Sequence, residues 1–143
     1  MMTGAIWPPA ERQRIAFSTA VTDNAPSFLI ADPDCLRREV LGNLLENAFR
    51  FTPAGGRVHL HVSGENGKVV FEVRDTGRAI APEDLPFVFD RYYQGRSRGR
   101  VGSGLGLPIA RAGVVAHGGE IEVGSGAGET VFRVTMPIHP AFE

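Results

Sequence analysis

The sequence is short of cysteine and lysine and contains no long apolar run. Its only cysteine, Cys35, excludes an internal disulfide framework and is typical of a reducing compartment. Lys68 is the only lysine among 15 basic residues, a bias from which no function follows. No apolar run approaches the roughly 20 residues of a membrane-spanning helix, and the first residues lack the charged and apolar regions of a signal peptide. We therefore expect a cytoplasmic chain without direct membrane contact.

Charge and composition narrow the class of protein further. The net charge is −1, so no overall field attracts nucleic acid or an anionic membrane. The 43% hydrophobic and 22% charged content is typical of a folded globular chain. A length of 143 residues is enough to bury one core. We expect a linker or cloning remnant over residues 1–13 and one domain over residues 14–140, monomeric when isolated.

The hydrophobic pattern predicts two long helices and one short one. Asp32 and Pro33 form a good helix start, with Asp as the N-cap, and apolar residues continue at helical spacing to about Phe51. A second long helix is predicted over 105–117, where a Gly-Gly pair ends it. Pro82, followed by two acidic residues, predicts a short helix over 82–91, and a loop rich in Gly and Arg follows over 92–104.

Six segments have strand character, and most of them pair into hairpins. They cover residues 14–21, 27–31, 57–62, 68–74, 120–124 and 130–136. Hairpins and helices in this order predict an α/β (α+β) two-layer sandwich and not a doubly wound parallel sheet. We expect a mixed, mostly antiparallel sheet of about five to six strands packed against three helices.

Two asparagines and an arginine line one stripe of the first long helix. Spacings of four and seven place Asn43, Asn47 and Arg50 on the same face. An asparagine oxygen is a hard neutral ligand that suits Mg²⁺, whose other ligands are phosphate oxygens and water. Arg50 would reach the phosphates as a fixed-charge donor. Taken alone, the same stripe also fits a solvated helix face, which is the commoner case.

An aspartate and a glycine follow the predicted strand 68–74. Such a pair often forms a simple turn, so Asp75 and Gly77 alone are weak signals. A buried aspartate can also accept a hydrogen bond from an exocyclic amine such as N6 of adenine, while a glycine lets the base approach closely. A site of this kind rejects a base with an oxygen at that place, because two acceptors would face each other.

A glycine-rich run, Gly102-Ser-Gly-Leu-Gly-Leu107, opens the second long helix. Glycines let backbone N–H groups approach phosphate, and a helix N-terminus favours negative charge. Turns of this kind have many false positives. This one is neither a P-loop, because no Gly-Lys-Ser/Thr follows, nor a convincing Rossmann fingerprint. The arginines between residues 91 and 100 fit a solvated loop, a small nucleic-acid patch or, beside a phosphate site, a mobile lid.

The order of these motifs resembles the catalytic ATP-binding domain of bacterial sensor histidine kinases, in the wider Bergerat-fold family of gyrase, Hsp90 and MutL. The likeness spans about residues 14–137. The N box is matched over 43–52, the first Gly box over 75–80, the F box over 87–93, the second Gly box over 102–107 and the closing strand over 130–137. The resemblance implies a Bergerat fold that binds ATP and Mg²⁺.

The resemblance also implies a role for each matching residue. Asn47 would bind Mg²⁺ with Asn43 beside it, and Asp75 would bind adenine N6 with Thr130 nearby. Arg50 and Phe51 would line the phosphate and sugar side, and Arg91 and Tyr92 the edge of the lid. The remaining implied nucleotide-binding residues belong to the two Gly boxes: Gly77, Ala79, Ile80, Gly102, Ser103, Gly104, Leu105, Gly106 and Leu107.

Two positions depart from the wider family. Ala79 stands where the first Gly box has its second glycine, which predicts weaker nucleotide binding. Asn43 stands where the ATP-hydrolysing relatives carry a general-base glutamate, as it does in histidine kinases, and this favours phosphoryl transfer to a partner over attack by water. The family's acceptor histidine lies on an upstream helical hairpin, and none of the four histidines here fits that place.

The resemblance predicts a protein-histidine kinase catalytic domain. It would present the γ-phosphate of ATP to a histidine on a separate helical dimerisation domain, for relay to a response regulator, with no nucleic acid as partner. The parent kinase would place this domain on the cytoplasmic side if it is an inner-membrane protein. Alternatives are a degenerate regulatory module, which Ala79 favours, an ATP-driven clamp, and a Ser/Thr kinase. The last two usually need the glutamate base.

Overall fold

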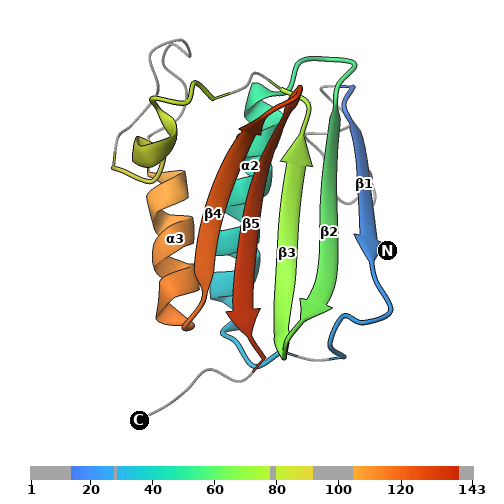
Figure 1. Ribbon diagram of the computed structural model, residues 1–143, viewed down its shortest axis with the longest axis vertical. Helices are drawn as coiled ribbons and strands as arrows, with labels where there is room; N and C mark the ends of the chain where they lie inside the picture. Colours follow the sequence, from blue (N-terminus) through green and yellow to red (C-terminus); the bar gives the residue numbers. More distant parts are fainter. Residues whose placement is uncertain (1–13, 28, 78–79, 92–104, 139–143) are drawn as a thin grey trace.

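The computed structural model describes residues 14–27, 29–77, 80–91 and 105–138. Five strands form one sheet in the order β1-β2-β3-β5-β4, and the long helices cover one of its faces (Figure 1). The elements in chain order are β1 Ala16–Val21, η1 Cys35–Gly42, α2 Asn43–Phe51, β2 Arg57–Glu65, β3 Lys68–Asp75, η2 Leu85–Phe87, α3 Gly106–Ala116, β4 Glu120–Gly126 and β5 Glu129–Pro137. The expected two-layer α/β sandwich is confirmed, with five strands.

The sheet is mixed, as predicted, because β1 runs parallel to β2 while all other neighbours are antiparallel. The hairpin of β2 and β3 turns at Asn66 and Gly67, whose φ angles of 51° and 77° suit a tight two-residue turn. β3 also pairs with β5, and its register sets Asp75 directly opposite Thr130. This pairing brings two of the predicted site residues to the same end of the sheet.

The strand predicted over 27–31 is wrong for the residues of that segment that the structure describes. Ile30 donates one backbone hydrogen bond, 3.0 Å long, to the carbonyl of Ile138 just past β5. Leu29 and Ala31 pack against the core from outside the sheet. This segment is therefore a connecting loop whose apolar side chains are buried against the core. A local hydrophobic pattern cannot distinguish such a loop from a strand.

The first long helix is continuous over residues 33–51, as predicted, but it has two geometries. Its first part, η1, is wound as a π-helix and its second part, α2, is a regular α-helix. Oδ1 of Asp32 accepts the backbone N–H groups of Asp34 and Cys35 at 3.0 and 3.3 Å, so Asp32 is the predicted N-cap.

The short helix predicted over 82–91 is wrong except for one turn. Only the 3₁₀ turn η2 forms, and other turns surround it. Pro86 lies four residues after Pro82, and a proline inside an α-helix loses its hydrogen bond and clashes with the carbonyl four residues earlier. The loop predicted over 92–104 lies outside the described residues, whereas the second long helix is confirmed as α3. No helix in the described ranges is long and apolar enough to span a membrane.

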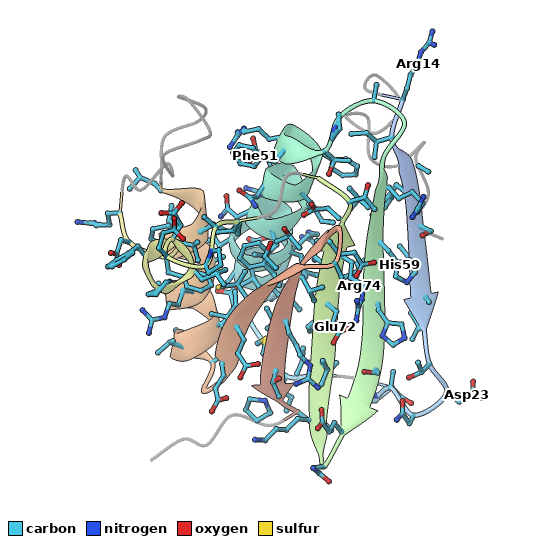
Figure 2. All side chains as sticks on the ribbon, turned by 45° about the horizontal axis from the view of Figure 1, so that its top comes forward. Arg14, Asp23, Phe51, His59, Glu72 and Arg74 are labelled. Atoms are coloured by element: carbon cyan, nitrogen blue, oxygen red, sulfur yellow. The ribbon has the colours of Figure 1, made fainter. Side chains whose placement is uncertain are left out.

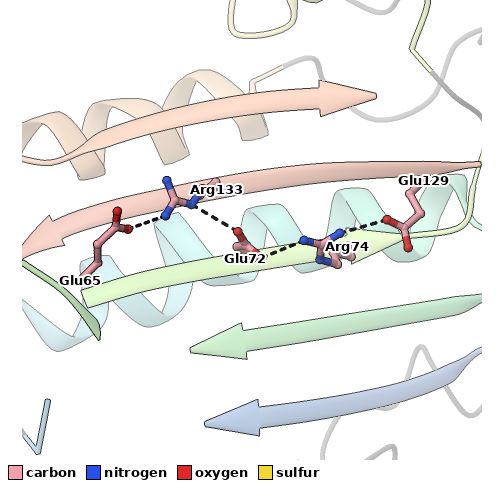
Figure 3. A network of polar contacts seen from close by, with 5 residues as sticks. All are labelled: Glu65, Glu72, Arg74, Glu129 and Arg133. Atoms are coloured by element: carbon pink, nitrogen blue, oxygen red, sulfur yellow. Dashed lines mark hydrogen bonds and ion pairs between the residues drawn. The ribbon is translucent and has the colours of Figure 1, made fainter. Parts of the chain in front are cut away.

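The two faces of the sheet differ in chemistry. The face under the helices holds the core, which includes Leu44, Phe49, Val73 and Phe132. The outer face carries a chain of ion pairs between β3, β5 and their neighbours (Figure 3). The pairs are Glu65–Arg133 at 2.6 Å, Arg133–Glu72 at 3.2 Å, Glu72–Arg74 at 3.2 Å and Arg74–Glu129 at 3.0 Å. All of these side chains keep some exposure, so each pair contributes less than about 1 kcal/mol, and this face is a polar surface.

Candidate functional site

The predicted site residues come together where the sheet and the two long helices meet. Asp75 ends β3 opposite Thr130 of β5. The backbone at Gly77 lies against the carbonyl of Phe51 at the end of α2, which Figure 2 shows at one end of that helix. Gly106, the first residue of α3, lies against the side chain of Asn43. Segments far apart in sequence therefore line one region with a sheet side and a helix side.

The sheet side of the site presents a buried carboxylate. Asp75 is 4% exposed and Thr130 is 3% exposed. Oδ1 of Asp75 accepts the backbone N–H of Gly77 at 2.9 Å, which closes a tight turn and fixes the carboxylate. A carboxylate accepts several hydrogen bonds, so an amine of a ligand can share it with Gly77. Because the carboxylate is buried, a base that places an acceptor against it loses a hydrogen bond that water cannot replace. The site therefore selects a base that carries a donor at this position.

Gly77 is required for space. A Cβ at this position would lie 2.3 Å from the carbonyl oxygen of Phe51 and 3.0 Å from Oδ1 of Asp75. Real side chains do not approach a backbone oxygen so closely, so any larger residue must displace either the turn or the end of α2. The close approach fixes the distance between the predicted base-binding aspartate and the N-box helix.

Ser125 contacts two of the predicted site residues and was not itself predicted from the sequence. Its Oγ accepts the backbone N–H of Ile80 at 2.8 Å and lies 3.2 Å from Oγ1 of Thr130. It comes from β4, where it pairs directly with Thr130 and follows Ile121 and Val123 in strand alternation. The alternation of Ile121, Val123 and Ser125 along the strand was the signal in the sequence that Ser125 faces inward.

The helix side of the site carries the polar stripe of α2. Asn43 and Asn47 lie on successive turns, and both are half-buried. Nδ2 of Asn43 donates to the carbonyl of Glu39 at 2.7 Å, while Oδ1 lies 3.1 Å from where a Cβ on Gly106 would be. Arg50 makes a partly exposed ion pair with Glu46 at 3.2 Å, which leaves its guanidinium at the surface end of the stripe.

The donor set fits Mg²⁺ only if phosphate completes the coordination. The described residues contain no group of three or more His, Cys, Asp or Glu side chains that could hold a metal ion. Asn43 and Asn47 each carry a neutral amide oxygen on the stripe, and Mg²⁺ commonly combines one or two protein ligands with phosphate oxygens and water. Asn47 therefore suits a metal that arrives with a nucleotide.

The other predicted residues fall into three groups. Ile80 and Leu107 are packed, since Ile80 is 8% exposed and Leu107 lies against the core. Arg91 is exposed in the turn after η2, and Leu105 precedes the first turn of α3. Five further residues lie outside the described ranges: Ala79, Tyr92, Gly102, Ser103 and Gly104.

The fold and this site agree with comparisons to known proteins. The family model of histidine kinase-, DNA gyrase B- and HSP90-like ATPases matches residues 31–140. The chain is 44% identical over 109 residues to the sensor histidine kinase CusS of Escherichia coli, covering 74% of this chain and 22% of CusS. It is 37% identical over 137 residues to the adaptive-response sensory kinase SasA of a Synechococcus strain, covering 94% and 36%. The chain thus spans well under two thirds of the length of these relatives.

Solved structures show the same fold. A mycobacterial sensor histidine kinase, MprB, aligns with a TM-score of 0.82 at 30% identity, over 96% of this chain and 93% of that one. Full-length ShkA in complex with AMPPNP aligns with a TM-score of 0.80 at 33% identity, over 97% of this chain and 29% of ShkA. The chain belongs to the histidine kinase-, DNA gyrase B- and HSP90-like ATPase family. Within that family it is a catalytic ATP-binding domain of the sensor histidine kinase kind.

Proposed function

We propose that this chain binds Mg-ATP and presents the γ-phosphate to a histidine of a separate helical dimerisation domain, for relay to a response regulator. The buried pair of Asp75 and Thr130 carries this proposal. It offers an acceptor to the N6 amine of adenine, while the stripe of Asn43, Asn47 and Arg50 lies on the helix side for metal and phosphate. The base and the phosphates thus have separate, chemically matched ends of one site.

Phosphoryl transfer, and not hydrolysis, is favoured by the residue at position 43. A general base for attack by water has to be a group that takes up a proton. Asn43 is an amide, and its Nδ2 already donates to the carbonyl of Glu39. It can orient a neighbour or a ligand, but it cannot accept the proton of water near neutral pH. In the proposed reaction a histidine of another domain takes the place of water as the nucleophile.

The histidines in the described residues are placed for other purposes. His59 and His61 lie on the outer sheet face, where Nδ1 of His59 is 2.7 Å from Oγ of Ser18. Figure 2 shows His59 on that side, with Glu72 and Arg74. His117 is bound between two helices, with Nε2 3.0 Å from the backbone nitrogen of Asp32. His139 lies outside the described residues. The placement of the three described histidines supports the proposal that the acceptor histidine belongs to another domain.

The exposed apolar side chains of α3 suit a helical partner. Ile109 is 42% exposed and Val115 is 56% exposed. Arg111 is the one charged residue of α3. Phe87 of η2 is another large apolar side chain with high exposure, at 51%. A helix that is apolar all round is normally covered on all sides. Because α3 starts beside Asn43, a helical domain docked near Ile109 in the first turns of α3 would bring its histidine toward the phosphate end.

The proposal is tested by supplying the missing half. The domain is titrated calorimetrically with Mg-ADP and Mg-GDP, and then incubated with labelled ATP with and without the helical phosphoacceptor domain of a relative. We expect adenine-selective binding, no acid-labile label on this chain alone, and label on the helical domain when both are present. Label on this chain alone would contradict the proposal, as would equal binding of the two nucleotides.

A degenerate regulatory module is the second candidate, because Ala79 replaces the second glycine of the first Gly box. It predicts neither Mg-ATP binding nor transfer. Nucleotide binding without transfer to several helical domains would favour a sensor of nucleotide over a kinase.

A further inference from the structure

The connection that leaves β3 is held at two points on the sheet side of the site. At its start, the N–H of Gly77 donates to Oδ1 of Asp75 at 2.9 Å. At Ile80, the backbone N–H donates to Oγ of Ser125 at 2.8 Å. The first anchor is local, two residues apart in sequence, but the second crosses 45 residues to the edge strand β4. The position of the Ile80 backbone therefore depends on one serine from another hairpin.

The same serine also contacts Thr130 on β5. Its Oγ lies 3.2 Å from Oγ1 of Thr130, which is 3% exposed and opposite Asp75. A hydroxyl that accepts the N–H of Ile80 can still donate its own hydrogen to Thr130. In that arrangement the Thr130 hydroxyl keeps its hydrogen for another acceptor. A donor at Thr130 beside an acceptor at Asp75 matches a base edge with one amine and one ring nitrogen acceptor, which is the edge of adenine.

We infer that Ser125 is a positioning residue for base selection. It holds the loop at Ile80 and orients the hydroxyl of Thr130, so that adenine is bound and guanine, with donor and acceptor reversed, is rejected. The inference rests on the proposed nucleotide site and adds a specificity role for a residue of β4. Ser125 acts through Ile80 and Thr130, and it is needed at the base end and not at the phosphate end.

The test separates the two ends of the site. Ser125→Ala and Ser125→Thr are titrated with Mg-ADP, Mg-GDP and magnesium tripolyphosphate. Loss of a hydrogen bond to a neutral group predicts a roughly three- to tenfold loss of Mg-ADP affinity in Ser125→Ala. Tripolyphosphate affinity should stay unchanged, and the preference for ADP over GDP should fall by the same factor as ADP affinity. Ser125→Thr keeps the hydroxyl and should keep the preference.

Ser63→Ala is the matched control. Ser63 lies on the outer face of β2, and its hydroxyl makes no hydrogen bond with any residue in the described ranges. This control should bind all three ligands like the parent chain. If Ser125→Ala loses affinity for tripolyphosphate as much as for ADP, the effect is general loosening and the inference is wrong. An unchanged preference for ADP would also overturn it.

Amide hydrogen exchange of the parent chain gives a measurement that needs no variant. The N–H of Ile80 should be protected at least tenfold more than an exposed amide, since it is bonded to a half-buried hydroxyl. Free exchange at Ile80 would overturn the inference even if Ser125→Ala did not fold. If the parent chain binds no adenine nucleotide while Ile80 is protected, the proposed function fails, and the base-selection role fails with it.

Discussion

Oδ1 of Asn43 lies 3.1 Å from the point where a Cβ on Gly106 would stand, so the N-box helix and the start of α3 share one tight contact. A methyl group there must push the amide of Asn43 by a few tenths of an ångström. The contact couples the polar stripe on α2 to the helix that begins at the proposed phosphate end. It is a place where a very small change should affect binding more than folding.

Gly106→Ala should weaken binding of Mg-ADP by about three- to tenfold, the cost of disturbing one hydrogen-bonded group. The free energy of unfolding should change by less than about 1 kcal/mol, because alanine is favoured over glycine in a helix by a similar amount. Calorimetric titration and thermal unfolding without nucleotide measure the two effects. An unfolding loss larger than the binding loss would show that Gly106 serves packing alone.

Gly77→Ala should damage the fold as well as the site. The new methyl group would lie 2.3 Å from the carbonyl oxygen of Phe51, and relieving such overpacking typically costs about 1–3 kcal/mol. We expect a lower midpoint in urea and a loss of nucleotide binding. Gly124→Ala is the matched control, because a Cβ at that point of β4 meets nothing within 4 Å. Equal stabilities of the two variants would contradict the steric account.

Asp75→Asn should remove most adenine binding and leave the fold intact. The asparagine oxygen can still accept the N–H of Gly77, so unfolding should become easier by no more than about 1 kcal/mol. The amide nitrogen, however, offers a donor where the carboxylate offered an acceptor. We expect at least a thirtyfold loss of Mg-ADP affinity, about 2 kcal/mol. Asp23→Asn, in the exposed turn after β1, should bind like the parent. Unchanged affinity in Asp75→Asn would refute the adenine assignment.

Ala79→Gly should strengthen nucleotide binding. Relatives use glycine at this place in the first Gly box, and a methyl group beside a base-binding turn costs on the order of 1–2 kcal/mol, or roughly five- to thirtyfold in affinity. Paired titrations of the parent chain and Ala79→Gly with Mg-ADP measure this gain. Melting temperatures without nucleotide separate a binding effect from a stability effect. Equal affinities would leave the degenerate-module alternative without its main support.

His117→Ala should loosen the join between the two long helices. Nε2 of His117 is 3.0 Å from the backbone nitrogen of Asp32, and Nδ1 is 2.9 Å from the carbonyl oxygen of Gly113. These partners require the neutral tautomer with hydrogen on Nδ1. Loss of both hydrogen bonds should destabilise the chain by about 1–3 kcal/mol, whereas His61→Ala on the outer face should cost less than about 0.5 kcal/mol. Nitrogen shifts that show hydrogen on Nε2 would contradict the geometry.

The sequence predicted those parts of the fold that depend on neighbouring residues. The Asp32 cap, the end of α3 at Gly118 and the hairpin of β2 and β3 are local, because each is decided by the backbone preferences or side-chain reach of a few adjacent residues. The connection of that hairpin is shorter than the predicted 63–67, since β2 continues to Glu65. The ordered motifs likewise indicated which elements would carry the site. Asp75, Thr130, Asn43 and Gly106 do lie at one junction of sheet and helices.

Other features depend on contacts between distant segments, and local patterns do not contain them. Residues 27–31 have the composition of a strand, yet the sheet offers them a loop position beside β5, and they bury their apolar side chains there. From the sequence alone, Gly77 could serve either the flexibility of a turn or the need for space. Only the packing of that turn on the end of α2 shows that space is what it provides.

The role of Ser125 at the candidate site also depends on contacts between distant segments. In the sequence it is one serine among glycines in a hairpin, and its place in the strand alternation predicts only that it faces inward. The pairing of β4 with β5 and the path of the chain after β3 place its hydroxyl between Ile80 and Thr130. The sequence determined the family, the cap, the hairpins and the residue types of the site, because these are local chemistry. The tertiary structure decided which backbone groups those residues hold, because a hydrogen bond across 45 residues exists only once the sheet has formed.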